Sequence, residues 1–235
     1  MKSTEEAENM VRKIKNYAGD NLSVSAAGQL SPLGDWRNMI AFVGDDQDAG
    51  THFIQADNLA TTVKNNYPQL NIQKIYFDAT QEVSTPGGQR YPEIQRAIVD
   101  RIQRGALLMT YIGHGGELGW AHERVLEVSD IQGWTNSQHL AAFLTATCEF
   151  TRVDDPERSS AGELVYLNPN GGGICLFTTS RLAYSGSNYQ FGQKFFENVF
   201  KPINGRYPTF GEIFEATKFA VSSVSNLRNM MLIGD

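Results

Sequence analysis

Two apolar segments of this sequence each lead to a side chain that can do chemistry. His114 follows the apolar residues 106–112, and Cys148 follows the apolar residues 141–147. A cysteine thiolate is a strong nucleophile, and a neighbouring imidazolium lowers the pKa of the thiol and later protonates a leaving amine. Together these residue types indicate Cys-His acyl transfer, most often peptide hydrolysis.

A third apolar segment, residues 39–43, leads to the adjacent acids Asp45 and Asp46. A carboxylate on the far side of an imidazole fixes the tautomer of the ring and stabilises its positive charge. Either acid is therefore a candidate for the third member of a catalytic group with His114 and Cys148.

Glycines surround the histidine at positions 113, 115 and 116. Because they have no side chains, they let the backbone approach a substrate closely and take φ angles that other residues avoid. The backbone N–H groups of Gly115 and Cys148 are the candidates for an oxyanion hole, which would stabilise the tetrahedral intermediate of acyl transfer.

The segments that must position these residues alternate between strand and helix patterns. Continuously apolar segments predict strands at residues 39–43, 71–77, 106–112, 141–147 and 173–179. Helical patterns predict helices at residues 4–17, 52–66, 92–103, 160–167, 188–200 and 209–223, with a short helix in the long loop after residue 112. This alternation predicts an α/β fold of three layers, α/β/α, around a mainly parallel sheet. Ligands of such sheets bind beyond the carboxyl ends of the strands, so the reactive residues are expected to converge at one edge.

Length and charge narrow the function classes. The 235 residues suffice for one sizeable domain, which we assign to residues 37–235, preceded by a helix and a turn-rich linker at residues 1–36. The net charge of −6 gives no basic footprint for nucleic acid. No apolar run approaches the roughly 18–20 residues that span a bilayer. The charged first ten residues do not form a signal peptide.

Other candidate motifs in the sequence do not match the full patterns of known nucleotide-binding or metal-binding motifs. The glycine-rich loop has Leu118 where a dinucleotide-binding G-x-G-x-x-G would need glycine. His122 and Glu123 lack the second histidine of a zinc-protease motif, and the histidines and Cys148 show no local ligand spacing, so no metal site is predicted. Cys175 is expected as a buried hydrophobe near the start of its strand, too far from Cys148 for a disulfide.

Several of these residues resemble the gingipain family of cysteine peptidases, whose peptidase domain has a caspase-like fold. The resemblance runs from about residue 4 to the last residue and is strongest at Gly113–Glu117, Trp120, Thr135–Ser137 with Leu140, and Cys148. It implies that Cys148 is the nucleophile and His114 the general acid and base. It places the third member on Asp46, with Asp45 as the adjacent alternative, and the oxyanion donors on the Gly115 and Cys148 amides.

The resemblance also implies a substrate pocket that departs from the arginine-specific members. Those members carry an aspartate at the pocket floor, where this chain has His52, so arginine specificity is not expected. The pocket wall is assigned to Tyr184, near Thr179 and Ser180. Arg181 in the same loop either favours an acidic group or has no role in substrate binding.

Residues 34–60 resemble a branch of the family, the PorU-type sortases of the type IX secretion system of Bacteroidetes. This implies removal of C-terminal sorting domains from secreted cargo at the outer-membrane surface, together with other secretion components, with lipopolysaccharide as an alternative acceptor to water. It also implies an isolated catalytic domain whose upstream subdomain precedes residue 4. A general gingipain-like endopeptidase and a catalytically silent caspase-like scaffold are the alternatives.

No cofactor is expected for catalysis by a Cys-His pair. Calcium is bound structurally in some members of the family, and two acidic loops, residues 45–48 and 152–157, are candidates for it here. Neither loop has an EF-hand ligand pattern, so solvated loops are the other interpretation.

Overall fold

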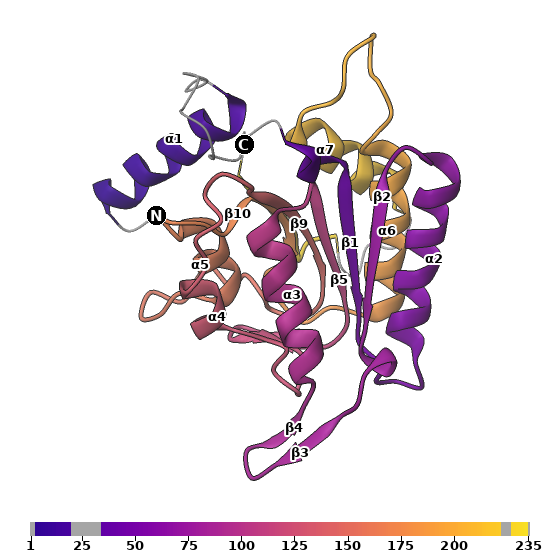
Figure 1. Ribbon diagram of the computed structural model, residues 1–235. Helices are drawn as coiled ribbons and strands as arrows, with labels where there is room; N and C mark the ends of the chain where they lie inside the picture. Colours follow the sequence, from indigo (N-terminus) through magenta and orange to yellow (C-terminus); the bar gives the residue numbers. More distant parts are fainter. Residues whose placement is uncertain (1–2, 20–33, 222–226, 235) are drawn as a thin grey trace.

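A six-stranded sheet forms the centre of the computed structural model, which describes residues 3–19, 34–221 and 227–234 (Figure 1). Its strand order is β11-β10-β9-β5-β1-β2, and all neighbours are parallel except β10 and β11. The strands are β1 (Met39–Gly44), β2 (Asn71–Tyr76), β5 (Leu108–Ile112), β9 (Ala141–Ala146), β10 (Gly173–Thr179) and β11 (Met230–Ile233). The prediction of a mainly parallel sheet is confirmed.

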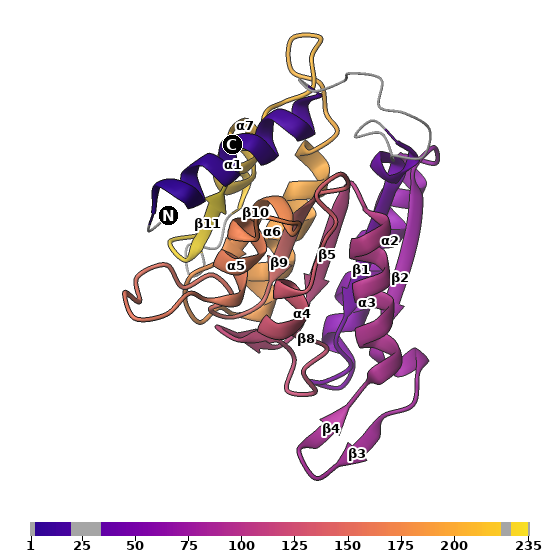
Figure 2. The ribbon, with the colours of Figure 1, turned by 60° about the vertical axis from the view of Figure 1, so that its left-hand side comes forward.

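Helices cover both faces of this sheet (Figure 2). One face carries α2 (Thr51–Asn66), α6 (Ser185–Asn198) and α7 (Phe210–Ala220), and the other carries α3 (Pro92–Arg104), α4 (Val128–Gln132) and α5 (Ala161–Leu167). The first helix, α1 (Thr4–Ala18), packs against α5 and β10. Its buried Lys13 donates a hydrogen bond to the carbonyl oxygen of Tyr166, 2.7 Å away. Among the described residues, no helix is long and apolar enough to cross a membrane.

Side chains alternate between the two faces along each central strand, as the pleat of a strand requires. In β1, Ile40 and Phe42 join the core cluster of α2 and α6, whereas Ala41 and Val43 join the cluster of α3, α4 and α5. Because both faces are buried, the central strands consist almost entirely of apolar residues and buried threonines, which explains why the sequence reads as continuous apolar runs.

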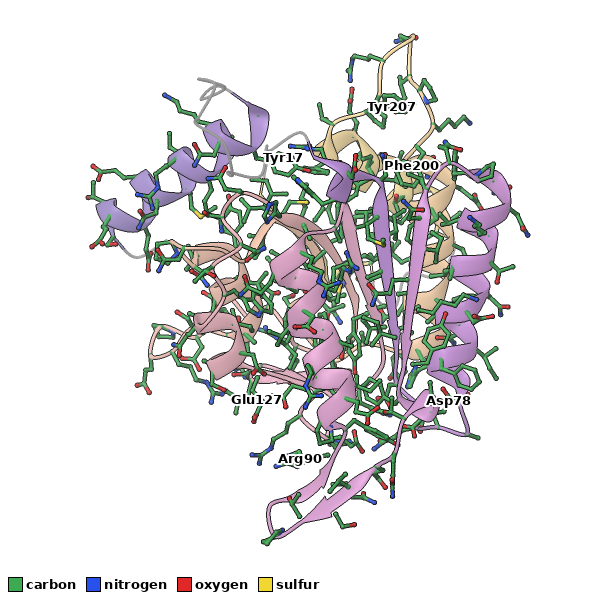
Figure 3. The ribbon with its side chains drawn as sticks, viewed as in Figure 1. Tyr17, Asp78, Arg90, Glu127, Phe200 and Tyr207 are labelled. Carbon is green, nitrogen blue, oxygen red and sulfur yellow. The ribbon has the colours of Figure 1, made fainter. Side chains whose placement is uncertain are left out.

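The carboxyl ends of the parallel strands lie together at one end of the molecule. In Figure 3, Asp78, which follows β2, and Arg90 lie near this end, while Phe200 and Tyr207 lie near the other. The hairpin of β3 (Val83–Thr85) and β4 (Gly88–Arg90) projects beyond the same end as Asp78 (Figure 1).

Some elements differ from the prediction. The loop after β5 holds the short helix α4 as expected, but it also forms a small sheet of β6 (Gly115–Gly116), β7 (Gly119–Trp120) and β8 (Leu126–Glu127). The edge strand β11 was not predicted, because a short segment gives too little pattern. The turn-rich segment expected before residue 37 lies largely outside the described residues, as does the end of the helix expected at 209–223.

The small sheet depends on Gly119. Its φ of 152° is one that side-chain-bearing residues rarely adopt, and an added Cβ would collide with the carbonyl oxygen of Leu126. Gly119→Ala is therefore expected to lower the free energy of unfolding by at least about 1–2 kcal/mol, the cost of a left-handed alanine. Urea denaturation measures this. Gly116→Ala is the control, since its Cβ would meet no atom within 4 Å; equal losses in both variants would contradict the prediction.

Candidate active site

His114 and Cys148 lie at equivalent positions beyond neighbouring strands. The parallel register of β5 and β9 pairs Ile112 with Ala146, and each reactive residue follows two positions later. Ile112 and Ala146 both face the core cluster of α2 and α6. Since side chains two positions apart share a face of a strand, the register brings the imidazole and the thiol to the same side of the sheet edge.

Contacts from the two covering helices agree with this placement. The His114 ring meets the ring of His52, in the first turn of α2, edge to face with 5.0 Å between centroids. The Cys148 sulfur lies 3.4 Å from the backbone nitrogen of Ala183, just before α6. A hydrogen bond of 3.1 Å from Gln55 to Ser185 joins the starts of these helices. The described residues contain no hydrogen bond between the thiol and the imidazole.

Asp45 anchors the backbone of the histidine and does not touch its ring. The carboxylate is fully buried and accepts hydrogen bonds of 2.9 Å from the backbone N–H groups of His114 and Gln47. A side chain at Gly113 would collide with Asp45 and Tyr111. The glycines beside the histidine were expected to take unusual φ angles, but none of the three has a positive φ. Gly113 is needed for close packing instead.

Asp48, and not Asp46, lies against the imidazole. Asp46 accepts a hydrogen bond of 2.7 Å from the hydroxyl of Tyr91, on the α3 side of the sheet. Asp48 Oδ2 lies 3.2 Å from Nε2 of His114. The family resemblance implied Asp46, with Asp45 as the alternative, whereas the chain turns between Asp46 and Gly50 and brings the later acid back to the ring.

The turn that carries Asp48 is held in a strained conformation. The φ angles of Asp48, Ala49 and Gly50 are 55°, 54° and 76°, so three successive residues occupy the left-handed region. Alanine pays about 1–2 kcal/mol there because its Cβ crowds the following carbonyl oxygen. Strain of this kind gathers at functional sites, where the surrounding structure maintains it. It points to Asp48 as a positioned residue.

Two further histidines flank His114. Burial lowers the pKa of His52 below the usual value for histidine, and the nearby Asp45 carboxylate opposes that shift. His122 stacks on His114 with 5.4 Å between ring centroids, and its Nδ1 lies 3.2 Å from Oε1 of Gln47. His122 was not expected in the site from the sequence. Its place could hardly be read from the sequence, because only the small sheet of β6, β7 and β8 brings His122 next to His114.

The backbone around the pair is compatible with an oxyanion hole. The Ala121 N–H donates to the carbonyl oxygen of His114 at 2.8 Å, next to the antiparallel pair of Gly115 and Trp120. In that arrangement the N–H of Gly115 points away from β7. Within the described residues, the N–H of Cys148 has no hydrogen-bond acceptor. Both amides predicted as oxyanion donors therefore remain available.

The predicted pocket residues have different environments. Tyr184 is 74% exposed and Leu182 is 71% exposed, on either side of the alanine that contacts the Cys148 sulfur. Thr179 is fully buried and its hydroxyl donates to the carbonyl oxygen of Thr147, so the expectation that it contacts substrate is wrong for its side chain. Ser180 is half-buried and its N–H donates to the carbonyl oxygen of Asn229 at 2.9 Å.

His52 also differs from its predicted place. It is 5% exposed and lies against His114 and Asp48, so its imidazole does not form the open floor of a pocket. The guanidinium of Arg181 forms a two-nitrogen ion pair with Asp154. The interpretation in which Arg181 lies at the surface without binding substrate agrees with that pairing.

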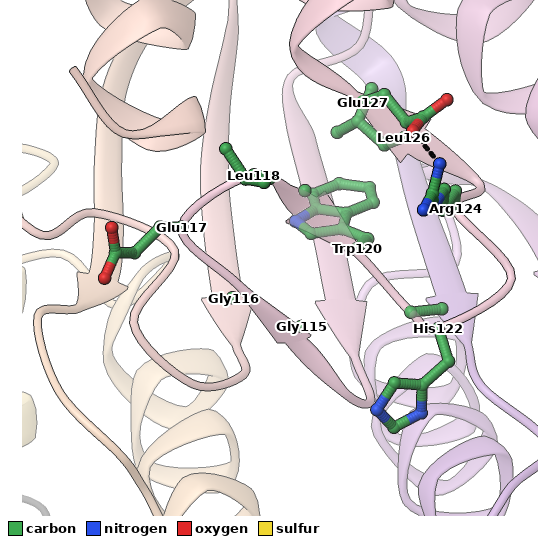
Figure 4. A pocket seen from close by; sticks show the side chains of 11 residues that line it. Gly115, Gly116, Glu117, Leu118, Trp120, His122, Arg124, Leu126 and Glu127 are labelled. Carbon is green, nitrogen blue, oxygen red and sulfur yellow. Dashed lines mark ion pairs between the residues drawn. The ribbon is translucent and has the colours of Figure 1, made fainter. Parts of the chain in front are cut away.

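A cavity of about 530 Å³ opens beside His122 along the small sheet (Figure 4). Leu118 is the exposed apolar residue of its lining, with Trp120 and Leu126 buried beneath it, and Arg124 and Glu127 form an ion pair of 3.6 Å on its rim. Glu117 lies away from His122 in Figure 4. Two arginines hold the Glu117 carboxylate at 2.5 Å each, Arg152 and Arg158.

In the two acidic loops that were candidates for calcium binding, most carboxylates already contact other protein groups. In residues 45–48, each acid already contacts backbone N–H groups, a tyrosine hydroxyl or histidine rings. In residues 152–157, Asp154 pairs with Arg181, and Asp155 pairs with Arg158 at 3.1 Å. Across the described ranges, one group of side chains could hold a metal ion: Asp48, His52 and His114, whose ligand atoms all lie within 4.8 Å of one another.

Comparison with known proteins places this geometry in a family context. The profile of Peptidase family C25 matches residues 1–235. The solved structure of the Arg specific cysteine proteinase gingipain R superposes with a TM-score of 0.76 and 18% identity, covering 100% of this chain and 52% of that one. The complex of Porphyromonas gingivalis RgpB pro- and mature domains gives a TM-score of 0.72 at 18% identity, covering 100% and 54%.

A more distant likeness extends to the Saccharomyces cerevisiae separase–securin complex, with a TM-score of 0.55 and 12% identity, covering 96% of this chain and 13% of that one. The chain thus spans about half the length of the solved gingipain chains that it matches. A search of curated proteins finds no match.

Proposed function

Because this chain belongs to peptidase family C25, we propose that it is the catalytic domain of a cysteine endopeptidase in which Cys148 is the nucleophile and His114 the proton donor. One observation carries the proposal: the β5–β9 register sets the thiol and the imidazole at equivalent positions beyond adjacent strands. Asp48 takes the place that the sequence analysis gave to Asp46, since its carboxylate contacts the ring.

The first half of the reaction forms a thioester. The Cys148 thiolate attacks the carbonyl carbon of the scissile peptide bond, and the N–H groups of Gly115 and Cys148 stabilise the oxyanion of the tetrahedral intermediate. The C–N bond then breaks. With Nε2 of His114 against Asp48, Nδ1 is the ring nitrogen left to give its proton to the leaving amine. These steps need no cofactor.

The second half of the reaction decides which product forms. Water attacking the thioester completes hydrolysis, whereas an amine attacking it completes transpeptidation. We propose the role of a type IX secretion sortase, which removes C-terminal sorting domains from cargo at the outer-membrane surface and passes the acyl group to an amine of lipopolysaccharide. The resemblance of residues 34–60 to the PorU-type sortases supports this role. General endopeptidase activity is the alternative, which the same catalytic residues would serve.

The substrate side chain before the scissile bond is proposed to lie against Leu182 and Tyr184. Both are exposed and apolar, and they flank the contact between Ala183 and the Cys148 sulfur. The one charged residue in the loop of residues 180–184 is Arg181, and its guanidinium is paired with Asp154. An uncharged substrate residue fits this surface better than an arginine, because residues 180–184 contain no carboxylate to receive a guanidinium.

The catalytic pair can be tested by labelling with a peptide that carries a thiol-directed electrophile. Cys148 is expected to react and Cys175 to stay unlabelled, because burial raises the pKa of Cys175 well above its usual value. His114→Ala should slow the labelling by about 100-fold or more, the usual contribution of a positioned acid or base. Mass spectrometry of the intact protein measures the rate. His122→Ala, which removes the other ring beside the site, is the control. Equal labelling of the wild type and His114→Ala would refute the proposal.

The assignment of the acid can be tested with matched amides. Asp48→Asn is expected to reduce kcat/KM by up to about fivefold, because an ion pair with an exposed carboxylate is worth at most about 1 kcal/mol. Asp46→Asn should leave kcat/KM within about twofold of wild type, since Asp46 contacts Tyr91 and not His114. Hydrolysis of a fluorogenic peptide measures both. A larger loss in Asp46→Asn than in Asp48→Asn would show that the wrong acid has been chosen.

The sortase role can be separated from general proteolysis by substrate. A cargo protein with its sorting domain is expected to be cut at a single junction, and an added amine should appear in the product, visible as a mass increment. Unrelated unfolded proteins, used as the control, should remain intact. Broad cleavage of those proteins would favour the general endopeptidase, without affecting the assignment of Cys148 and His114.

A further inference from the structure

We infer that Asp48, His52 and His114 form a binding site for Zn²⁺ at the catalytic imidazole. The fold brings together three ligand atoms from separate places: Oδ2 of Asp48 in the strained turn, Nε2 of His52 in the first turn of α2, and Nε2 of His114 after β5. Two imidazoles and one carboxylate are the ligand set of many zinc sites that keep an open fourth position.

The distances fit a tetrahedral ion. Zinc bonds of about 2.0–2.1 Å at tetrahedral angles place neighbouring ligand atoms about 3.3 Å apart. Asp48 Oδ2 lies 3.3 Å from Nε2 of His52 and 3.2 Å from Nε2 of His114. All three atoms lie within 4.8 Å of one another, so a small movement of the rings closes the third edge.

His52 provides an independent indication of a ligand. It is 5% exposed, its Nδ1 has no hydrogen-bond partner, and its Nε2 lies 3.3 Å from Oδ2 of Asp48, in an ion-pair contact. A buried polar group without a partner is destabilising, because it has given up its hydrogen bonds to water. A metal ion between the three ligand atoms would give Nε2 a coordinate bond in place of its contact with Asp48. Helix α2 and the strained turn hold this ring and carboxylate four residues apart, on one side of the catalytic histidine.

The solvent side of the site gives an ion both an entry path and an open position. The side chain of Asp48 is 60% exposed and that of His114 is 34% exposed. Hard ions such as Ca²⁺ and Mg²⁺ prefer sets of oxygen ligands, whereas imidazole suits zinc and its neighbours in the first transition series. The site should therefore select Zn²⁺ over Ca²⁺ and Mg²⁺.

Bound zinc would stop the proposed peptidase reaction, and this consequence rests on the proposed function. With the metal on Nε2 of His114, the ring carries one proton, on Nδ1. Giving that proton to a leaving amine would leave an imidazolate, so the donor step becomes costly. Binding itself does not depend on any peptidase activity.

Isothermal titration calorimetry of the protein with Zn²⁺ tests the site directly. Wild type is expected to bind one ion, and Co²⁺ should give the visible absorption of a four-coordinate centre. Asp48→Asn and His52→Gln should each weaken Zn²⁺ binding by more than the roughly 10–100-fold lost when an outer-shell partner is removed. Circular dichroism checks that His52→Gln is folded. If it is not folded, the loss of Zn²⁺ binding in Asp48→Asn tests the site.

Two variants act as matched controls. Cys148→Ser and His122→Gln remove the other nearby ligand types and should leave the affinity for Zn²⁺ unchanged. The inference is overturned if wild type does not bind Zn²⁺, if Cys148→Ser abolishes binding while His52→Gln retains it, or if His122→Gln weakens binding as much as His52→Gln. None of these outcomes bears on the labelling of Cys148, so the site and the peptidase assignment can fail separately.

Discussion

The parallel register between β5 and β9 is the constraint on which the site depends. It pairs Ile112 with Ala146 and thereby sets His114 and Cys148 level with each other. Strand spacing of about 4.8 Å then brings two side chains within reach of one substrate carbonyl. A shift by one residue would turn one of the two groups to the opposite face of the sheet. The buried faces of both strands prevent such a shift, because it would place core residues against the wrong layer.

Close packing around His114 also fixes the position of the catalytic histidine. Asp45 is buried and its carboxylate accepts two backbone N–H groups, so it fixes the loops after β1 and β5 relative to each other. The absence of a side chain at Gly113 allows that approach. The acid that follows the strand thus holds the backbone of the site, and the later acid, Asp48, reaches the imidazole. Neighbouring carboxylates have separate tasks because their environments differ.

The sequence predicted those features that follow from regular structure. Continuous apolar runs identified the central strands, and the rule that chemistry gathers at their carboxyl ends brought His114 and Cys148 together. What escaped prediction lies where regular structure stops. The choice between Asp45, Asp46 and Asp48 depends on left-handed residues in a turn, which a sequence pattern does not reveal for aspartate and alanine. The burial of Thr179 could have been read from its place inside the strand β10. The four-residue spacing of Asp48 and His52 was visible, but it has meaning only once the third ligand is known.

His52 determines which charges lie beside the catalytic histidine at this edge of the sheet. Its buried imidazole packs on the ring of His114 and lies 3.3 Å from the carboxylate of Asp48. Burial lowers the pKa of His52, so above that value the ring adds no second positive charge beside the proton donor. The same neutral nitrogen is a ligand for a metal ion. One residue type at a fixed place in the fold therefore bears both on the charge beside His114 and on the proposed binding of zinc.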